Sequence, residues 1–124
     1  MDSDQSMNGC DTLNVVESNL CEGNGANGIE LWDGEANTVK NNTCLNNSRL
    51  APGRYSGILV SVTSRSVVSG NRCFDNQPTK TQKHGIEELS DCQANVITDN
   101  DCRENAQSGL SLAGRGSQYG ANNE

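Results

Sequence analysis

The sequence predicts an all-β solenoid, in which short strands wind into stacked coils of similar length. Three observations support this prediction: a polar motif that recurs four times, an apolar alternation led by glycine after each copy, and no helical periodicity of 3.6. The motif copies are NVVESNLCEGN at 14–24, NTVKNNTCLNN at 37–47, SVVSGNRCFDN at 66–76 and NVITDNDCREN at 95–105. Periods of this length are typical of repeat architectures, in which each unit packs only on its neighbours.

The copies fit the pattern N/S-x-V/I-x-x-N-x-C-x-x-N and so place one asparagine and one cysteine at equivalent points of each coil. The central asparagines are Asn19, Asn42, Asn71 and Asn100, and the cysteines are Cys21, Cys44, Cys73 and Cys102. Asparagine tolerates left-handed backbone conformations, and its amide both donates and accepts hydrogen bonds. Coils stack at about 4.8 Å, so we expect an asparagine ladder at one corner and an inward-facing cysteine ladder beside it.

Each repeat also contains three short segments with strand character. The glycine-led segments are GIEL at 28–31, GILV at 57–60, GIEE at 85–88 and GLSL at 109–112, and their alternation of period two predicts a strand. A second strand is expected at the apolar pair before each central asparagine, and a third around each cysteine. The prediction is therefore about four coils of three strands over residues 14–113. Residues 1–13 are expected to be an N-terminal extension or partial cap, and the glycine-rich residues 114–124 a flexible C-terminal tail.

The composition alone points elsewhere, because Leu, Ile, Val and Phe make up only 22 of 124 residues and the net charge is −7. Such values are typical of disordered chains. The repeat outweighs them, since it keeps apolar positions in register with Asn and Cys, and a thin solenoid core needs few apolar side chains. The acidic balance argues against nucleic-acid binding, which requires a basic surface. We expect no membrane span and find no signal peptide at Met1.

Cysteine usage leaves three alternatives: a reduced ladder, one or more disulfides, or a metal site. The reduced ladder is favoured, because stacked parallel side chains keep their Cβ atoms slightly too far apart for a disulfide. The full-repeat spacing also lacks the paired C-x-x-C of zinc sites, so no metal site is predicted. Cys10 and Cys92 lie outside the ladder, and a bond between them would have to bridge two or more coils.

Two insertions interrupt the second and third repeats, where the first and fourth have only three residues. They are SRLAPGRYS at 48–56 and QPTKTQKH at 77–84, called the insertion loops below. Because they fall on consecutive coils, we expect them to lie side by side at one edge. They contain no Asp or Glu in an otherwise acidic chain, but do contain Arg49, Arg54, Tyr55, Lys80, Lys83 and His84. They are either solvated loops with incidental charge or a binding lip for an anionic or hydroxyl-rich ligand.

The third repeat is one residue longer than the first two between its glycine and the next motif. We expect a bulge at Glu87–Glu88 that leaves both carboxylates outside and returns Leu89 to the core, since an unpaired buried Glu88 would be costly. The outer face of the glycine-led strands would then carry Glu30, Leu59, Glu87 or Glu88, and Ser111. Trp32, Asp33, Glu35 and Asp91 lie at or just past the strand ends. Trp32 would either stack on a sugar ring or cover the core.

The repeats resemble those of the right-handed parallel β-helix proteins of the pectate-lyase-like superfamily. The nearest in style are the degenerate repeats of alginate epimerases and nitrous oxide reductase accessory proteins. The resemblance covers residues 14–113 and implies a right-handed helix with polysaccharide on the outer face of the glycine-led strand. In that superfamily, acidic residues there hold calcium in lyases and perform acid–base work in hydrolases. The catalytic motifs are absent, however: only KHG at 83–85 resembles the polygalacturonase set, and the D-P-H core of the alginate epimerases is missing.

Three functions follow from these patterns. The first is a non-catalytic β-helix module that binds polysaccharide or forms a structural part of a surface, envelope or phage protein. The second is a small or truncated polysaccharide lyase, epimerase or glycoside hydrolase. In this enzyme, Glu87, Glu88 or Asp91 would act as the acid or as a metal ligand, and Lys83 or Arg54 would act as the base. Calcium would be its cofactor, whereas the binding module is expected to have none. The third is a structural spacer without a ligand. The first is favoured, because Glu30 and Glu87 are two coils or about 10 Å apart, at or beyond the spacing of inverting enzymes.

The candidate ligand-binding residues are the charged and aromatic side chains of the loops and of the outer face. They are Glu30, Trp32, Asp33, Arg49, Arg54, Tyr55, Lys80, Lys83, His84, Glu87, Glu88 and Asp91. His84 is the only histidine and is expected to be a solvated loop residue. Both ends of the solenoid lack clear caps, which predicts a homodimer or higher oligomer through one end. The competing expectation is a monomer whose tails fold back as caps. The fold suggests an extracellular, envelope or viral setting.

Overall fold

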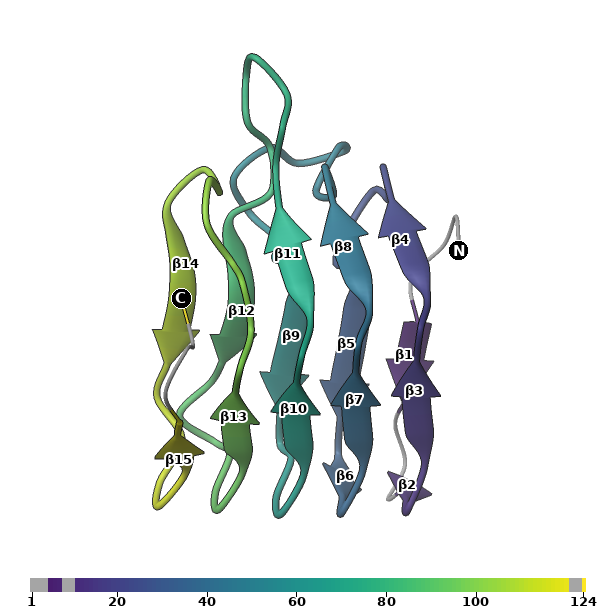
Figure 1. The fold of residues 1–124 in the computed structure, drawn as a ribbon, viewed down its shortest axis with the longest axis vertical. Coiled ribbons are helices and arrows are strands. Elements are labelled where there is room, and N and C mark those ends of the chain that lie inside the picture. Colours follow the sequence, from purple (N-terminus) through teal and green to yellow (C-terminus); the bar gives the residue numbers. More distant parts are fainter. Residues whose placement is uncertain (1–4, 8–10, 121–123) are drawn as a thin grey trace.

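The computed structural model describes residues 5–7, 11–120 and 124, which form a parallel β solenoid (Figure 1). These residues contain 15 short strands and no helix, hence no helix that could cross a membrane. Every strand pairs in parallel with its equivalent on the neighbouring coil. The all-β solenoid expected from the repeats is therefore confirmed. Expectations about Cys10 lie outside the described residues.

Three main sheets run the length of the stack. The first holds β1 (Gln5–Met7), β5 (Ile29–Trp32), β9 (Ile58–Ser61), β12 (His84–Glu88) and β14 (Ser108–Leu112). The second holds β3 (Val15–Glu17), β7 (Thr38–Lys40), β10 (Val67–Ser69), β13 (Val96–Thr98) and β15 (Gln118–Tyr119). The third holds β4 (Leu20–Glu22), β8 (Thr43–Leu45) and β11 (Arg72–Phe74), and β2 (Asp11–Thr12) pairs with β6 (Gly34–Glu35) at a corner. In Figure 1 the first sheet lies behind the other two.

Three coils are described throughout, and they begin at β5, β9 and β12. They are flanked by the coil of β1 to β4 and by a partial coil from β14 to β15, close to the expected four coils. The core between the sheets is one side chain thick. Its columns follow the strand register, for example Ile29, Ile58 and Ile86 in the first sheet, each with no exposed surface. Such a core explains why a chain with few apolar residues folds.

The central asparagines form a continuous ladder along one corner. The Asn71 side chain makes hydrogen bonds to both neighbouring coils. Its Oδ1 accepts from the backbone N–H (2.9 Å) and Nδ2 (3.1 Å) of Asn42. Its Nδ2 donates to Asn100 Oδ1 (3.0 Å) and to the Val39 carbonyl (3.1 Å). Asn71 is fully buried, so the amide satisfies backbone groups that water cannot reach. The predicted asparagine ladder is confirmed.

The first and last positions of the motif form two further ladders, which the sequence analysis did not predict. One runs through Asn14, Asn37, Ser66, Asn95 and Ser117, with amide or hydroxyl oxygens accepting backbone N–H groups at 2.9 to 3.0 Å. The other runs through Asn24, Asn47, Gln82 and Asn105. In this ladder Gln82 takes the place of Asn76, the last residue of the third motif copy. Asn76 instead exchanges hydrogen bonds with Asn46, because the second insertion loop carries the chain outward before it returns.

The ladder cysteines stack in register on the inner side of the third sheet, as the predicted inward-facing cysteine ladder. Cys21 pairs with Cys44 and Cys44 with Cys73, and all four ladder cysteines are fully buried. The cysteines of the described residues are free thiols. The glycines that begin the glycine-led strands lie directly against this column. A Cβ on Gly57 would come within 3.1 Å of Cys73 Cβ and 2.8 Å of the Gly85 carbonyl oxygen, so no side chain fits there.

Thiol ionisation differs along the column. Burial is the main cause that raises the pKa of Cys73, and burial also raises the pKa of Cys92 to about 11. Hydrogen bonds from the Cys21 and Cys73 thiols lower the pKa of Cys44, although burial opposes its ionisation. Because none of the ladder sulfur atoms is exposed, their reactivity depends on access.

The C-terminal residues differ from the expected tail. Arg115 bridges to Gln93, and β15 pairs with β13, so residues 115–119 continue the solenoid as a partial coil. The expectation of a flexible tail over residues 114–124 is therefore wrong for residues 115–119. The glycines are compatible with this path, since Gly116 supplies a turn with φ of +68°. The partial coil also supplies Ser117, the last member of the Asn14 ladder.

We expect Asn71→Ala to lower the free energy of unfolding by about 1 to 3 kcal/mol, because the buried partners of its amide lose their hydrogen bonds. Asn14→Ala is the matched control, since Asn14 is exposed and, among the described residues, its ladder contacts are with Asn37 alone. Urea unfolding followed by circular dichroism measures both variants. Equal losses at the two positions would contradict a stabilising role for the inner ladder members.

We expect the ladder cysteines to be reduced and to react slowly with a chromogenic disulfide reagent in the native protein, and rapidly in urea. The measurement is made in a Cys10→Ser background, so that only the described cysteines are counted. Leu50→Cys provides a positive control, because Leu50 is 89% exposed. Intact mass showing a disulfide between ladder positions, or fast labelling without denaturant, would be the opposite result.

Candidate functional site

The outer face of the first sheet carries a polar row that crosses the coils, as the sequence predicted. Glu30, Leu59, Glu87 and Ser111 are register neighbours and point outward; we call this row the first-sheet face. Glu30 accepts a hydrogen bond from Asn27 Nδ2 at 3.0 Å. Glu87 accepts from Ser56 Oγ at 2.9 Å and forms an ion pair with Lys83 Nζ at 3.1 Å. The half-buried Leu59 lies between the two carboxylates.

Glu88 does not belong to this face, and the predicted bulge at Glu87–Glu88 is wrong. Glu88 is 1% exposed and continues the inward column of Leu31 and Val60 in strict alternation. The extra residue of the third repeat is accommodated in the turn after β12. There Leu89 is half-buried and its N–H donates to the Val60 carbonyl at 3.0 Å. The argument from the cost of burial failed because it assumed that the Glu88 carboxylate would lack partners.

The Glu88 carboxylate accepts four hydrogen bonds inside the C-terminal end of the solenoid. Oε1 accepts from Tyr119 Oη at 2.6 Å and from the Gly114 N–H at 2.8 Å. Oε2 accepts from Ser117 Oγ at 2.7 Å and Asn95 Nδ2 at 2.9 Å. Burial, followed by the hydrogen bond to Glu88, raises the pKa of Tyr119 to about 12, so its hydroxyl keeps its proton at neutral pH. Glu88 therefore holds the last partial coil against the stack.

The insertion loops lie side by side, as predicted, and project from the same end of the coils (Figure 1). Gly53 N–H donates to the Thr81 carbonyl at 2.7 Å, and Lys83 N–H donates to the Tyr55 carbonyl at 2.8 Å. The second loop is organised by the buried Asp75, whose carboxylate accepts the N–H groups of Gln77, Thr81 and Gln82. Although burial opposes its ionisation, these backbone hydrogen bonds lower the pKa of Asp75.

The basic residues of the loops fall into two groups. Three are occupied: Lys80 Nζ donates to the Asp75 carbonyl, Lys83 pairs with Glu87, and the His84 ring contacts Ser108 Oγ at 2.7 Å. His84 is 8% exposed at the start of β12, so the expectation of a solvated loop histidine is wrong. Arg49 and Arg54 are exposed and have no ion-pair partner among the described residues. Arg54 lies over the Tyr55 ring at 5.6 Å.

The remaining candidates gather at the opposite ends of the strands. Trp32 is 46% exposed and lies beside Ser61 in the register. Asp91 accepts from the Val62 N–H at 3.0 Å and from Ser61 Oγ at 3.3 Å. Asp33 lines a small hollow of about 180 Å³ together with Glu35 and neighbouring residues. Strands of four to five residues, at about 3.3 Å per residue, separate this group from the insertion loops.

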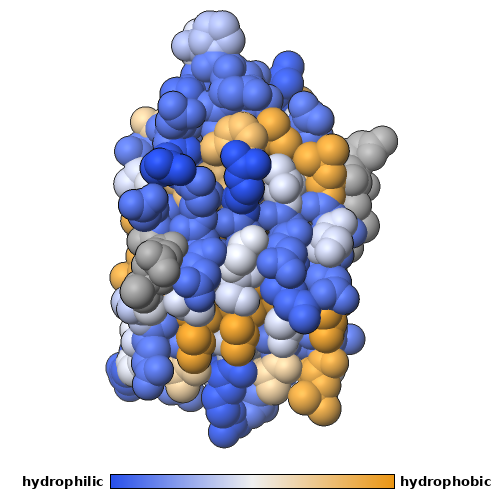
Figure 2. All heavy atoms as spheres, in the orientation of Figure 1, coloured by the Kyte–Doolittle hydropathy of each residue, from blue (hydrophilic) through white to orange (hydrophobic). Residues whose placement is uncertain are grey.

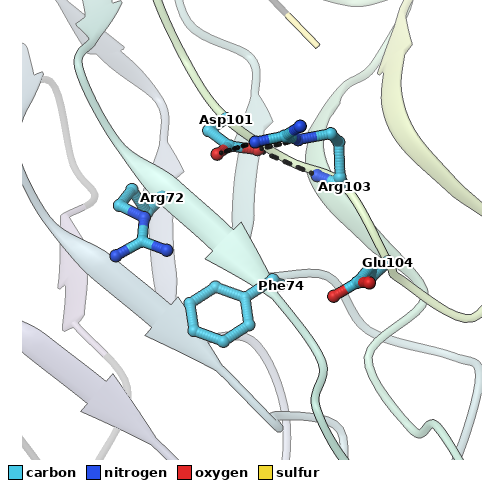
Figure 3. Close-up of a pocket in the computed structure, with 5 residues that line it drawn as sticks. All are labelled: Arg72, Phe74, Asp101, Arg103 and Glu104. Atoms are coloured by element: carbon cyan, nitrogen blue, oxygen red, sulfur yellow. Dashed lines mark hydrogen bonds and ion pairs between the residues drawn. The ribbon is translucent and has the colours of Figure 1, made fainter.

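A larger hollow lies on the opposite side of the solenoid, on the outer face of the third sheet. This pocket has a volume of about 330 Å³, and we call it the β11 pocket (Figure 3). Its lining residues are Arg72, Phe74, Asp101, Arg103 and Glu104. The sequence analysis did not identify it. The sequence signal that could have revealed this pocket is the outward-facing position before each ladder cysteine. Along the stack this position changes from Leu20 and Thr43 to the charged Arg72 and Asp101.

Within the described residues, no group of three or more His, Cys, Asp and Glu side chains is arranged to hold a metal ion. The acidic candidates are spread over separate positions and separate partners. Glu30 lies beside Asn27, Glu87 beside Lys83, and Asp91 at the Val62 backbone. The described side chains therefore provide hydrogen-bonding and ionic contacts along an extended face.

The fold and its repeats define a right-handed β-helix protein. The model of the right-handed β-helix region matches residues 4–124, so the chain belongs to this family. Among solved structures, the A-module of the mannuronan C-5 epimerase AlgE6 from Azotobacter vinelandii is similar, with a TM-score of 0.68 and 17% sequence identity. The similarity covers 96% of this chain and 35% of that chain, so this protein spans about a third of the similar module. No curated protein sequence matches.

We expect Glu88→Gln to lower the free energy of unfolding by about 1.5 to 3 kcal/mol or more, because donors that share a charged acceptor lose it. Glu17→Gln is the matched control: its carboxylate is half-exposed and pairs with Lys40 at 3.5 Å, and loss of such an exposed ion pair costs about 0 to 1 kcal/mol. Urea unfolding measures stability, and trypsin cleavage after Arg115 reports release of the last partial coil. Equal effects of the two substitutions on both readouts would show that Glu88 does not hold that coil.

Proposed function

We propose that this chain is a non-catalytic β-helix module that binds an extended polysaccharide along the first-sheet face. The observation that carries this proposal is the pair of hydrogen-bonded insertion loops beside that face. They present two exposed arginines, Arg49 and Arg54, without ion-pair partners among the described residues. Solvated loops with incidental charge would need no such mutual hydrogen bonding. The similar structure belongs to an enzyme named for a polysaccharide, mannuronan, which supports the ligand class.

The face offers the contacts that a hydroxyl-rich chain requires. Guanidinium groups donate in a planar fork that fits carboxylates and hydroxyl pairs, and Tyr55 adds an aromatic surface beside Arg54. The carboxylates of Glu30 and Glu87 accept hydrogen bonds, and Ser111 adds a hydroxyl. A ligand that runs across the strands meets one residue of this row on each coil. Repetition of weak contacts along a rigid surface then supplies the affinity.

The same geometry argues against the enzyme alternative. Glu88 is internal, and Glu30 and Glu87 are separated by two coils, about 10 Å, with Leu59 between them. That spacing lies at or beyond the range of inverting glycosidases. Lys83, the proposed base, is held in an ion pair with Glu87, and Asp91 accepts from the Val62 backbone. Binding through the face requires none of these groups to transfer a proton.

Affinity electrophoresis tests the proposal. Native gels are cast with polymannuronate, polygalacturonate, xylan or mixed-linkage glucan, and retardation of the protein gives an apparent Kd. We expect retardation by at least one polymer, and about tenfold weaker binding in an Arg49→Gln/Arg54→Gln variant, equivalent to about 1.4 kcal/mol. Arg65→Gln is the matched control, because Arg65 is also exposed but pairs with Glu35 at a different corner.

Two results would overturn the proposal. If no polymer retards the protein, the structural-spacer function replaces it. If the same polymers yield unsaturated products or new reducing ends, with or without calcium, the enzyme alternative replaces it. Equal affinity of the double variant and the Arg65→Gln control would remove the insertion loops from the binding surface.

A further inference from the structure

The β11 pocket lies outside the first-sheet face and draws its residues from two coils. Arg72 and Phe74 come from β11, and Asp101, Arg103 and Glu104 from the equivalent segment of the next coil. Viewed as in Figure 1, the molecule presents apolar residues in two bands, over the third and second sheets, with strongly hydrophilic residues beside the upper band (Figure 2). The pocket lies where Phe74 meets these hydrophilic groups. It therefore combines an aromatic surface with charged groups at its rim.

Two of the charged groups satisfy each other. The Arg103 guanidinium donates to both carboxylate oxygens of Asp101, each at 2.8 Å. This pair lowers the pKa of Asp101 to about 2 and raises the pKa of Arg103. The bidentate arrangement fixes one wall of the pocket in a single geometry. Figure 3 shows both hydrogen bonds, with the pair above the Phe74 ring.

The other two charged side chains are uncommitted. Arg72 packs over the Phe74 ring at 5.2 Å, and no carboxylate of the described residues lies within ion-pair distance of it. The exposed Glu104 carboxylate lies across the pocket, with the ring of Phe74 between the two (Figure 3). The pocket thus holds three groups in a row: the hydrogen-bond donors of the Arg72 guanidinium, the Phe74 ring, and the accepting carboxylate of Glu104. A ligand must match all three.

The charge balance selects the class of ligand. Two guanidinium and two carboxylate groups line the pocket, so their charges cancel, and the whole chain is acidic at −7. No net positive field is present to attract a phosphate or a polyanion. A neutral ring with several hydroxyl groups fits better, because each hydroxyl both donates and accepts. The volume of about 330 Å³ is at the lower end of small-molecule sites, which suits one sugar ring.

We propose that the β11 pocket binds one neutral pyranose unit of a polysaccharide, with a C–H face of the sugar against Phe74. The Arg72 guanidinium donates to hydroxyl oxygens on one side, and the Glu104 carboxylate accepts from hydroxyl groups on the other. This site is independent of the proposed function, since it uses the opposite side of the solenoid. A module with both sites would contact two polysaccharide chains at once.

Nuclear magnetic resonance of the full chain tests the pocket. Cellohexaose, xylohexaose and mannohexaose are titrated separately, and the Arg72 Nε–H and Phe74 ring signals are followed. We expect at least one of these sugars to shift both signals, and Arg72→Gln to weaken its binding at least tenfold. Phe74→Ala should act similarly. Arg65→Gln is the control at another corner, and amide spectra confirm that each variant is folded.

Each outcome decides between the two sites. Shifts of the Arg72 and Phe74 signals in the unsubstituted protein, with the Phe74 shift lost in Arg72→Gln, support the pocket, even if Phe74→Ala does not fold. Shifts at Arg54 and Trp32 alone overturn the pocket and leave the proposed function standing. Hexagalacturonate is titrated in the same way as an anionic comparison, and its tighter binding than that of every neutral sugar overturns the neutral class. No shift of the Arg72 or Phe74 signals by any sugar at 10-millimolar concentration, a generous excess over weak affinities of about 1 mM, overturns the site.

Discussion

The rest of the structure depends on the hydrogen bonds between equivalent asparagines of successive coils. Each inner amide of the central ladder binds the coil before it and the coil after it, as Asn71 does toward Asn42 and Asn100. These contacts fix the corners at which the chain must bend without regular secondary structure. With three such ladders in place, a core only one side chain thick is sufficient. Both outer faces are then rigid, and the positions of their side chains follow from the coil register.

Two departures from the regular repeat show how rigidity and variation are combined. Gln82 reaches the ladder position that Asn76 leaves, so the second insertion loop interrupts the chain without interrupting the hydrogen bonds. At the C-terminal end, Glu88 takes a core position and binds four donors of the last coil and its neighbours. In both places a longer polar side chain replaces a standard residue and reaches groups that the regular repeat would not satisfy.

The sequence was sufficient to predict the fold, because the spacing of Asn42, Cys44 and their equivalents repeats in every coil. The neighbouring insertion loops and the outward row with Glu30 and Glu87 were predictable for the same reason. Glu88 was not, since its burial depends on donors from Gly114, Ser117 and Tyr119, which no local pattern connects to it. Nor was the β11 pocket, because Arg72 and Glu104 belong to different coils and show no relation until the coils are stacked. Local periodicity thus reveals the scaffold, while contacts between non-equivalent positions emerge only in three dimensions.

The replacement of Asn76 by Gln82 in its ladder has an evolutionary consequence. A coil that can close its corner with a residue from beyond an insertion tolerates changes of loop length without rebuilding its interior. The corner after the third sheet is therefore where new surface can accumulate by small insertions, one coil at a time. The opposite constraint holds at the glycine column, where Gly57 and Gly85 leave no room for a methyl group. Related modules should therefore differ in loop length at the corner after the third sheet, and should keep glycine at the positions of Gly57 and Gly85.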